Sequence, residues 1–215
     1  MKKSIIVLFI AAMPAMVHAQ STGILGRKIS KEMLSDPQYT APNTVPEENG
    51  KIVFKTSITA AGKSKEDIYA KVAQWASLRY EANSTRGVYT DLDFYKNLEY
   101  SKVKEIDKQG GKIQCQGAEE LIFSLKPLAK NFTQAFYLLD LTVNEGSVDF
   151  NLHNLAFNVD KGEGEFERVT AEEWISDKEC LNKKGELRRI PGKFRIKTIE
   201  LVKELEKEIS EAINK

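Results

Sequence analysis

The stretch that decides the fold is VPEENGKIVFKTSITAAGKSKEDIYAKVAQWASLR, from Val45 to Arg79. Between Ile52 and Thr59, alternate residues share a face in the period of two that is typical of a half-buried strand. Ser64 is then placed to cap a helix, in which apolar residues recur at helical spacing from Ile68 to Ala76. A strand and a helix with matching apolar faces predict a two-layer domain.

The first 19 residues have the features of a secretory signal peptide. Two lysines precede an apolar run from Ile5 to Ala12, and small residues precede a predicted cleavage site after Ala19. This run is too short to span a bilayer, and no later stretch is apolar enough to form a transmembrane helix. We therefore expect an exported protein of the periplasm or cell envelope, with Gln20 as its new N-terminus.

The remaining chain divides into an arm and one domain. Residues 20–46 contain three prolines among polar residues and are expected to form an N-terminal arm or linker. Residues 47–215 are expected to form a single domain with its own core. After cleavage, 30 basic residues would oppose 31 acidic ones. Such a balance provides no field that attracts nucleic acid, and we expect no nucleic-acid partner.

The second half of the domain is rich in strand patterns. Alternation predicts strands over residues 101–107, 112–125, 132–143 and from 148 onward. The inward parity switches at Leu155, which predicts a bulge or the end of the strand. Gly117 lies inside a predicted strand and indicates either a bulge or a close approach of another group to the backbone.

The C-terminal part is expected to contain an irregular excursion and a long helix. Residues 160–192 are rich in charge and glycine, with one short helix predicted at a capping box from Thr170 to Glu173. The final helix, from Phe194 to Ile213, has an apolar stripe suited to cover a sheet. The chain therefore predicts an α+β fold. Its element order is β-α-β-β-β-β-α, with an antiparallel sheet of about five strands covered by two helices.

Two regions supply the candidate binding residues. The connection from Glu81 to Tyr100 is rich in aromatic residues, which would either line a recognition surface or pin the loop to the core. These residues are Tyr89, Phe94, Tyr95 and Tyr100. The second region is a basic cluster between Lys178 and Lys197 that includes Arg188 and Arg189. It would either contact an acidic glycan or partner, or form an ordinary solvated surface.

Few residues support catalysis. His153 is the one histidine outside the signal peptide, and it alternates with Asp149 and Asn151 on the polar face of a strand. An orienting aspartate would suit a catalytic histidine, whereas a solvated edge histidine explains the same pattern. No Ser or Cys lies in a nucleophile motif such as G-x-S-x-G, and multi-histidine metal motifs are excluded. We expect no catalytic residue, metal or cofactor.

The two cysteines allow one disulfide. Cys115 lies on the apolar parity of its strand, and Cys180 lies in a polar stretch. In an oxidising compartment the two either pair, or remain as one buried and one exposed thiol.

Several motifs in a particular order support a family resemblance. They include Gly50-Lys51-Ile52-Val53-Phe54, the helix entry from Gly62 to Tyr69, Trp75, and a Gly-Lys-Ile-x-Cys-x-Gly strand from Gly111 to Gly117. With these motifs in this order, the chain resembles exported Bacteroidetes proteins that carry the domain of unknown function 4468, which has a TBP-like fold. The resemblance covers residues 45–158 and implies no reaction and no catalytic residues.

These observations favour a non-enzymatic binding or interaction module, with an envelope protein or glycan as its partner. The alternative is a hydrolase whose Asp, Glu or Tyr residues are scattered in the sequence. A concave pocket that groups carboxylates with raised pKa values would indicate it. Apolar residues on both faces of the strand at 132–143 also leave open a homo-oligomer.

Overall fold

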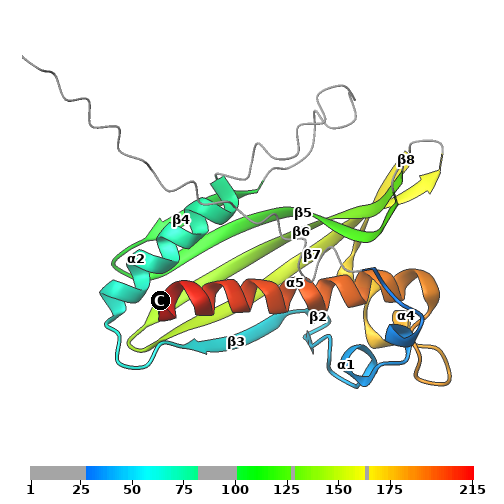
Figure 1. Ribbon diagram of the computed structural model, residues 1–215, viewed down its shortest axis with the longest axis horizontal. Helices are drawn as coiled ribbons and strands as arrows, with labels where there is room; N and C mark the ends of the chain where they lie inside the picture. Colours follow the sequence, from blue (N-terminus) through cyan, green and yellow to red (C-terminus); the bar gives the residue numbers. More distant parts are fainter. Residues whose placement is uncertain (1–27, 82–100, 127–128, 163–164) are drawn as a thin grey trace, which may run out of the picture.

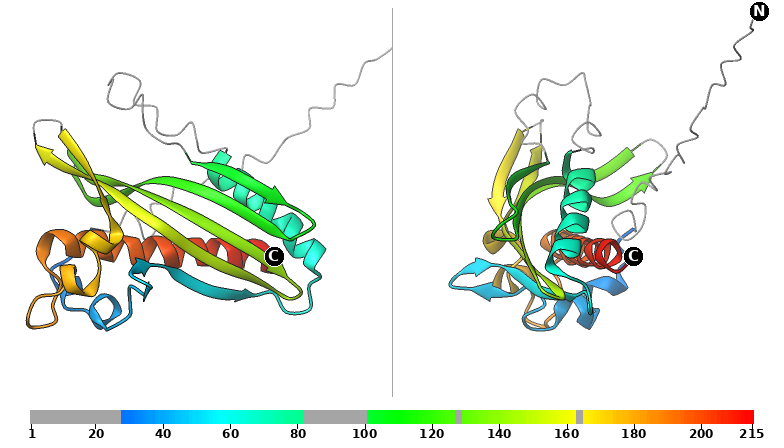
Figure 2. Two further views of the ribbon diagram at one scale, coloured as in Figure 1. Left: turned by 180° about the vertical axis from the view of Figure 1, so that it is seen from behind. Right: turned by 90° about the vertical axis from the view of Figure 1, so that its left-hand side faces the viewer.

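A computed structural model describes residues 28–81, 101–126, 129–162 and 165–215. The protein has two layers, an antiparallel sheet and a pair of helices packed on one of its faces (Figures 1 and 2). The predicted α+β fold is confirmed. The sheet has more strands than the five expected.

Within the described residues, six strands form the sheet. They are β3 Phe54–Thr59, β4 Lys102–Asp107, β5 Lys112–Lys126, β6 Ala129–Asn144, β7 Ser147–Gly162 and β8 Glu165–Thr170. Their order is β3-β7-β6-β5-β4, every pairing is antiparallel, and β8 also pairs with β7. The first half of β7 pairs with β3 and its second half with β8, so these two short strands follow one another along the same edge of β7. A small hairpin of β1 (Glu47–Glu48) and β2 (Lys51–Ile52) precedes β3.

Two helices, α2 (Lys65–Ala76) and α5 (Arg189–Asn214), cover one face of the sheet (Figure 1). Seen from behind, the strands lie in front of α5 (Figure 2, left). The start of α2 is as predicted, since Ser64 Oγ accepts a hydrogen bond from the backbone N–H of Asp67 at 3.2 Å. This bond satisfies an N–H group that has no partner inside the helix. One apolar core fills the space between the two layers.

The strand β7 contains the bulge that the parity switch indicates. Its register with β6 shifts by one residue between His153 and Ala156. Asn154 lies within this shift at φ 53°, a left-handed conformation that Asn adopts more readily than most residues. As a result, Leu152 and Leu155 are both buried, although they are three positions apart along the strand.

Residues 28–46, part of the expected arm, pack against α5 and share its core. This segment includes η1 (Glu32–Leu34) and α1 (Pro37–Thr40), and it buries Met33, Tyr39 and Val45. Because a sheet can bury only one stripe of a helix, a helix buried all round needs a second cover. Residues 194–202 of α5 are all buried, and the N-terminal segment provides that cover.

The buried half of α5 contains charged side chains, and each has a partner. The Arg195 side chain is fully buried, its Nη1 lies 2.6 Å from Asp177 Oδ1, and its Nε donates to the carbonyl of Tyr39 at 2.8 Å. Lys197 Nζ lies 2.7 Å from Glu200 Oε2. A buried charge without a partner would be strongly destabilising, so these pairs are a condition for burying α5.

Residues 160–192 are more regular than the predicted excursion. They complete β7, form β8, and add two short helices, α3 (Ala171–Trp174) and α4 (Asp177–Cys180). The predicted capping box is confirmed, because Thr170 and Glu173 each accept a hydrogen bond from the other's backbone N–H. Only Val169 of β8 is buried, so this strand has almost no apolar alternation by which it could be predicted. Pro191 lies in the first turn of α5, where a helix tolerates proline, so α5 begins before the predicted Phe194.

Gly117 allows an aromatic ring to contact the backbone of β5. It pairs with Tyr137 of β6, and a Cβ at Gly117 would lie only 2.1 Å from Cζ of that ring. The register of β5 with β6 runs through this pair without a shift. Close approach, rather than a bulge, therefore explains the glycine.

We predict that Gly117→Ala lowers the free energy of unfolding by about 1–3 kcal/mol, because the Tyr137 ring must move to admit the methyl group. Urea denaturation of the variant and the unchanged protein measures this loss. In a Tyr137→Leu background the ring is absent and the cost of Gly117→Ala should shrink. Equal costs in the two backgrounds would contradict the explanation.

Candidate functional site

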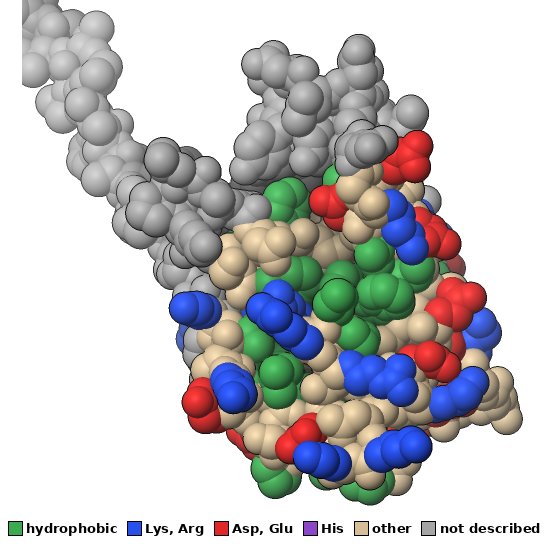
Figure 3. Space-filling model, turned by 90° about the vertical axis from the view of Figure 1, so that its right-hand side faces the viewer, with side chains coloured by type: hydrophobic (Ala, Val, Ile, Leu, Met, Phe, Trp, Pro, Cys, Tyr) green, Lys and Arg blue, Asp and Glu red, His purple; other side chains and the backbone are tan. Residues whose placement is uncertain are grey.

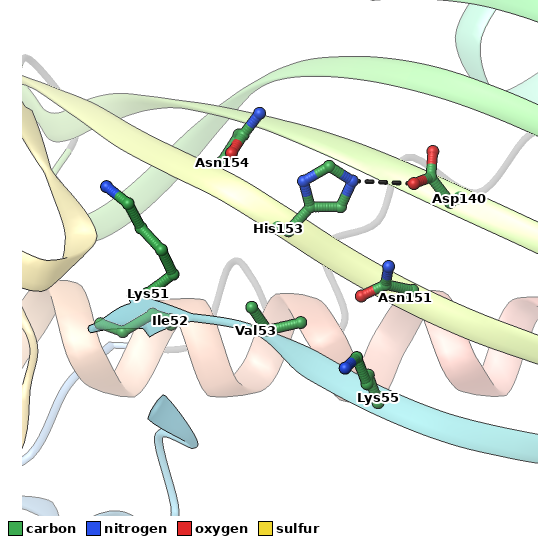
Figure 4. A pocket seen from close by; sticks show the side chains of 8 residues that line it. All are labelled: Lys51, Ile52, Val53, Lys55, Asp140, Asn151, His153 and Asn154. Carbon is green, nitrogen blue, oxygen red and sulfur yellow. Dashed lines mark hydrogen bonds and ion pairs between the residues drawn. The ribbon is translucent and has the colours of Figure 1, made fainter. Parts of the chain in front are cut away.

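The face of the sheet that the helices leave uncovered contains a shallow pocket beside the bulge of β7 (Figure 4). Its volume is about 320 Å³. It is lined by Lys51, Ile52, Val53, Lys55, Asp140, Asn151, His153 and Asn154. These residues come from the β2–β3 segment, β6 and β7, and we call the site the His153 pocket.

A row of hydrogen bonds across three strands orients His153. Its Nε2 lies 2.9 Å from Asp140 Oδ2 of β6, and Gln114 of β5 donates to the other oxygen of Asp140 at 2.7 Å. The sequence pattern offered Asp149 as the orienting aspartate, but a residue four positions away along a strand lies about 13 Å distant. The partner of His153 is therefore across the sheet, and the row fixes the imidazole beside the pocket.

Asn151 contributes an acceptor that has no partner within the described residues. Its Oδ1 is buried and receives no hydrogen bond there. A buried oxygen without a donor costs about 1–3 kcal/mol. Figure 4 shows this side chain in the lining of the pocket, on the same strand as His153. A hydroxyl or amine of a ligand in the pocket could supply the missing donor.

The rim of the His153 pocket is basic. Lys51 and Lys55 lie on it, and Lys55 pairs with Glu48. Both side chains of that pair are about half exposed, so solvent weakens the interaction. Among the described residues, Asp140 is the one carboxylate in the lining, and no Ser, Thr, Tyr or Cys of these residues belongs to it. The pocket therefore has hydrogen-bond donors and acceptors for a polar ligand but no side-chain hydroxyl or thiol nucleophile.

A second polar cluster lies on the helix-covered side, where η2 (Ser77–Glu81) continues α2. Arg79 of η2 forms ion pairs with Glu119 of β5 and Glu208 of α5. The Tyr137 hydroxyl donates to Glu119 and lies 3.1 Å from the Tyr80 hydroxyl. The cluster thus joins a helix, the sheet and α5 through one guanidinium.

Burial is the largest cause of the pKa shifts of the tyrosines and of Glu208 in this cluster. It raises the pKa of Tyr80 and of Tyr137 well above the usual value of 10, and for Tyr137 the Glu119 carboxylate adds to the effect. Burial also raises the pKa of Glu208, while Arg79 opposes that shift. Since Arg79 engages both carboxylates, the geometry suits cross-linking of the elements better than proton transfer to a substrate.

The raised pKa values of Tyr80 and Tyr137 predict that the folded protein loses stability at alkaline pH. Their pKa values are raised on folding, so the stabilisation is complete below the unfolded pKa near 10 and is lost as the pH rises further. Between pH 10 and 11 the free energy of unfolding should fall by up to about 1.4 kcal/mol per pH unit for each tyrosine. Urea titrations across this range should give a shallower slope for Tyr137→Phe, whereas an unchanged slope would refute the assignment.

The predicted binding residues fall into two groups. The aromatic candidates lie outside the described residues: Tyr89, Phe94, Tyr95 and Tyr100. Arg188 and Arg189 are exposed where α5 begins. The structure therefore places the basic candidates on a different surface from the pocket.

Cys115 of β5 and Cys180 of α4 are both fully buried. In the described part of the chain no disulfide joins them. Burial raises the pKa of the Cys180 thiol to about 12. A thiol with such a pKa is a poor nucleophile at neutral pH.

Sequence reasoning considered His153 but missed Asp140 and Asn154. Asp140 is a charged residue between the buried Leu139 and Leu141, and such an interruption of an apolar strand is a usable signal. Asn154 lies where the parity of β7 changes, and asparagine at a bulge is a second signal. Neither signal says that the two residues flank His153, because that depends on the strand register.

Comparison with known proteins finds one family model that matches part of the chain. The model for the domain of unknown function DUF4468, with TBP-like fold, matches residues 54–158. Over this range the chain is similar to the DUF4468 family. The match runs from β3 through most of β7, close to the range of the resemblance found in the sequence. It includes the His153–Asp140 pair and excludes both Lys51 and the start of α5.

Two solved structures have the same fold. A DUF4468 family protein from Bacteroides ovatus ATCC 8483 aligns with a TM-score of 0.69 and 27% identity, covering 84% of this chain and 96% of that one. A TBP-like protein from Parabacteroides distasonis ATCC 8503 aligns with a TM-score of 0.60 and 19% identity, covering 79% and 96%. At that lower identity the second likeness concerns the fold alone. A search of curated proteins found no match.

Proposed function

We propose that this DUF4468 protein is an exported, non-enzymatic binding module of the periplasm or cell envelope, and that the His153 pocket is its binding site. The observation that carries the proposal is the buried Oδ1 of Asn151, which has no donor within the described residues and lies in the lining of the pocket. A binding site gains affinity when a ligand satisfies such a group, because the cost of leaving it unpaired is removed.

The chemistry of the lining favours a ligand rich in hydroxyl groups, such as an envelope glycan. Lys51 and Lys55 can donate hydrogen bonds, and Asn151 and Asn154 can both donate and accept them. The hydrogen bond between Asp140 and His153 holds the imidazole in one orientation. Precisely oriented polar groups of this kind select ligands by hydrogen bonding. An envelope protein that presents a polar loop is the second partner class consistent with the lining.

Binding through the pocket predicts that Asn151→Ala weakens the affinity by at least fivefold, the value of about one hydrogen bond. Titration with soluble peptidoglycan fragments and envelope oligosaccharides, followed by NMR or calorimetry, measures the affinity. Asn158→Ala is the matched control, because Asn158 lies on the same strand outside the pocket lining. The proposal fails if none of these probes binds, or if both variants bind as well as the unchanged protein.

Export predicts cleavage after Ala19. Residues 1–19 support this part of the proposal by their two lysines, apolar run and small residues before the site. Cell fractionation and N-terminal sequencing should recover a chain that begins at Gln20 outside the cytoplasm. A chain that stays in the cytoplasm with Met1 intact would contradict export while leaving the pocket proposal standing.

A hydrolase remains the alternative, and the raised pKa of Glu208 is the observation that favours it. Glu208 and Glu119 are the two carboxylates of the Arg79 cluster. The alternative is weaker because Arg79 engages both. If that cluster were catalytic, the unchanged protein would hydrolyse envelope polymers and Glu208→Gln would abolish this activity. The binding proposal expects no hydrolysis by the unchanged protein or by the variant.

A further inference from the structure

A second surface, which shares no residue with the His153 pocket, lies at the end of the molecule where α5 begins. Residues 181–193, called here the basic end, contain one acidic residue, Glu186. Five basic residues accompany it: Lys183, Lys184, Arg188, Arg189 and Lys193. No ion pair with a described carboxylate involves any of the five. Figure 3 shows Lys and Arg side chains around exposed hydrophobic side chains on this end of the protein, with Asp and Glu side chains mainly toward its edges.

The loop of the basic end has a defined shape. Leu181 and Leu187 form an isolated antiparallel bridge, and the backbone N–H of Arg188 donates to the carbonyl of Cys180 at 2.8 Å. Asn182 Oδ1 accepts from the backbone N–H groups of Lys184 and Glu186, at 2.8 and 3.1 Å. These bonds hold the lysine-bearing tip beside the first turn of α5.

An exposed isoleucine lies among these charges. Ile190 is 61% exposed. Gly192 packs inward, since a Cβ there would lie 2.8 Å from Leu187 Cβ. Two residues apart on a helix correspond to about 200° of rotation, so Ile190 points to the opposite side, toward solvent. The chain therefore presents a large exposed apolar side chain directly after two exposed arginines, Arg188 and Arg189.

We propose that the basic end docks on the surface of an anionic phospholipid membrane, with Ile190 inserted at the level of the headgroups. Basic side chains near an anionic bilayer each strengthen binding by about fivefold. Apolar side chains that accompany them gain by entering the headgroup–acyl boundary. An acidic glycan would match the charges but would provide no apolar environment for Ile190, which is why the pattern favours lipid. Docking there would hold the protein at the membrane and leave the His153 pocket, on other elements, to bind its own ligand.

Vesicle binding tests the proposal. The readout is the ratio of the partition coefficients of the full chain on vesicles with phosphatidylglycerol and on pure phosphatidylcholine vesicles. Every variant keeps residues 1–27, so any contribution of the apolar run at Ile5–Ala12 is common to all of them. Arg188→Ala/Arg189→Ala should lower the ratio by about 25-fold, for two charges at about fivefold each. The control, Lys102→Ala/Lys104→Ala on exposed positions of β4, should leave the ratio within twofold.

A second pair of variants tests the apolar contact. Ile190→Ser should lower partitioning onto the anionic vesicles by about tenfold. Ile106→Ser is the matched control, because Ile106 is 59% exposed on β4, and it should have no effect. Circular dichroism checks that all variants fold. The proposal is overturned if the unchanged protein shows no preference for anionic vesicles, if variants and controls behave alike, or if the protein is retained on an acidic polysaccharide column without binding vesicles.

Discussion

The burial of α5 is the constraint on which the rest of the structure depends. The sheet covers one stripe of this helix, and the N-terminal segment 28–46 covers the side that the sheet cannot reach. The complete burial of residues 194–202 is compatible with charged side chains because Arg195 contacts Asp177 and two backbone carbonyls, and Lys197 pairs with Glu200. The position of α5 also determines which face of the sheet is left uncovered and where the basic end projects.

The two faces of the sheet consequently have different chemistry. On the covered face, Arg79 ties Glu119 and Glu208 together, so the polar groups there are committed to holding helices on strands. On the uncovered face, Asn151 of β7 lies opposite Asp140 of β6, and His153, which lies opposite Leu138, reaches Asp140 diagonally just before the bulge at Asn154. The DUF4468 match includes this second arrangement, whereas the basic end lies outside it. The proposed binding site therefore lies mostly within the range of the DUF4468 match, and the proposed docking surface lies outside it.

Local patterns predicted most of the fold because each depends on neighbouring residues alone. The Ser64 cap, the alternation of β3 and the capping box at Thr170 all involve residues within a few positions of one another. The strand β8 was not predicted, since only Val169 in it is buried and alternation has nothing apolar to detect. The segment 28–46 looked like an arm because its few apolar residues are buried by α5, which is more than 140 residues away in the chain.

The sequence by itself determined α2, the strands with clear alternation, the faces that these elements bury and the family resemblance, because periodicity and capping are local properties. Only the tertiary structure decided which strands are neighbours and in which register they pair. A period of two says which face of a strand a side chain occupies but not which residue lies opposite. That is why His153 was recognisable in the sequence while its partner Asp140 was not. The unsatisfied oxygen of Asn151 and the exposure of Ile190 are likewise results of packing.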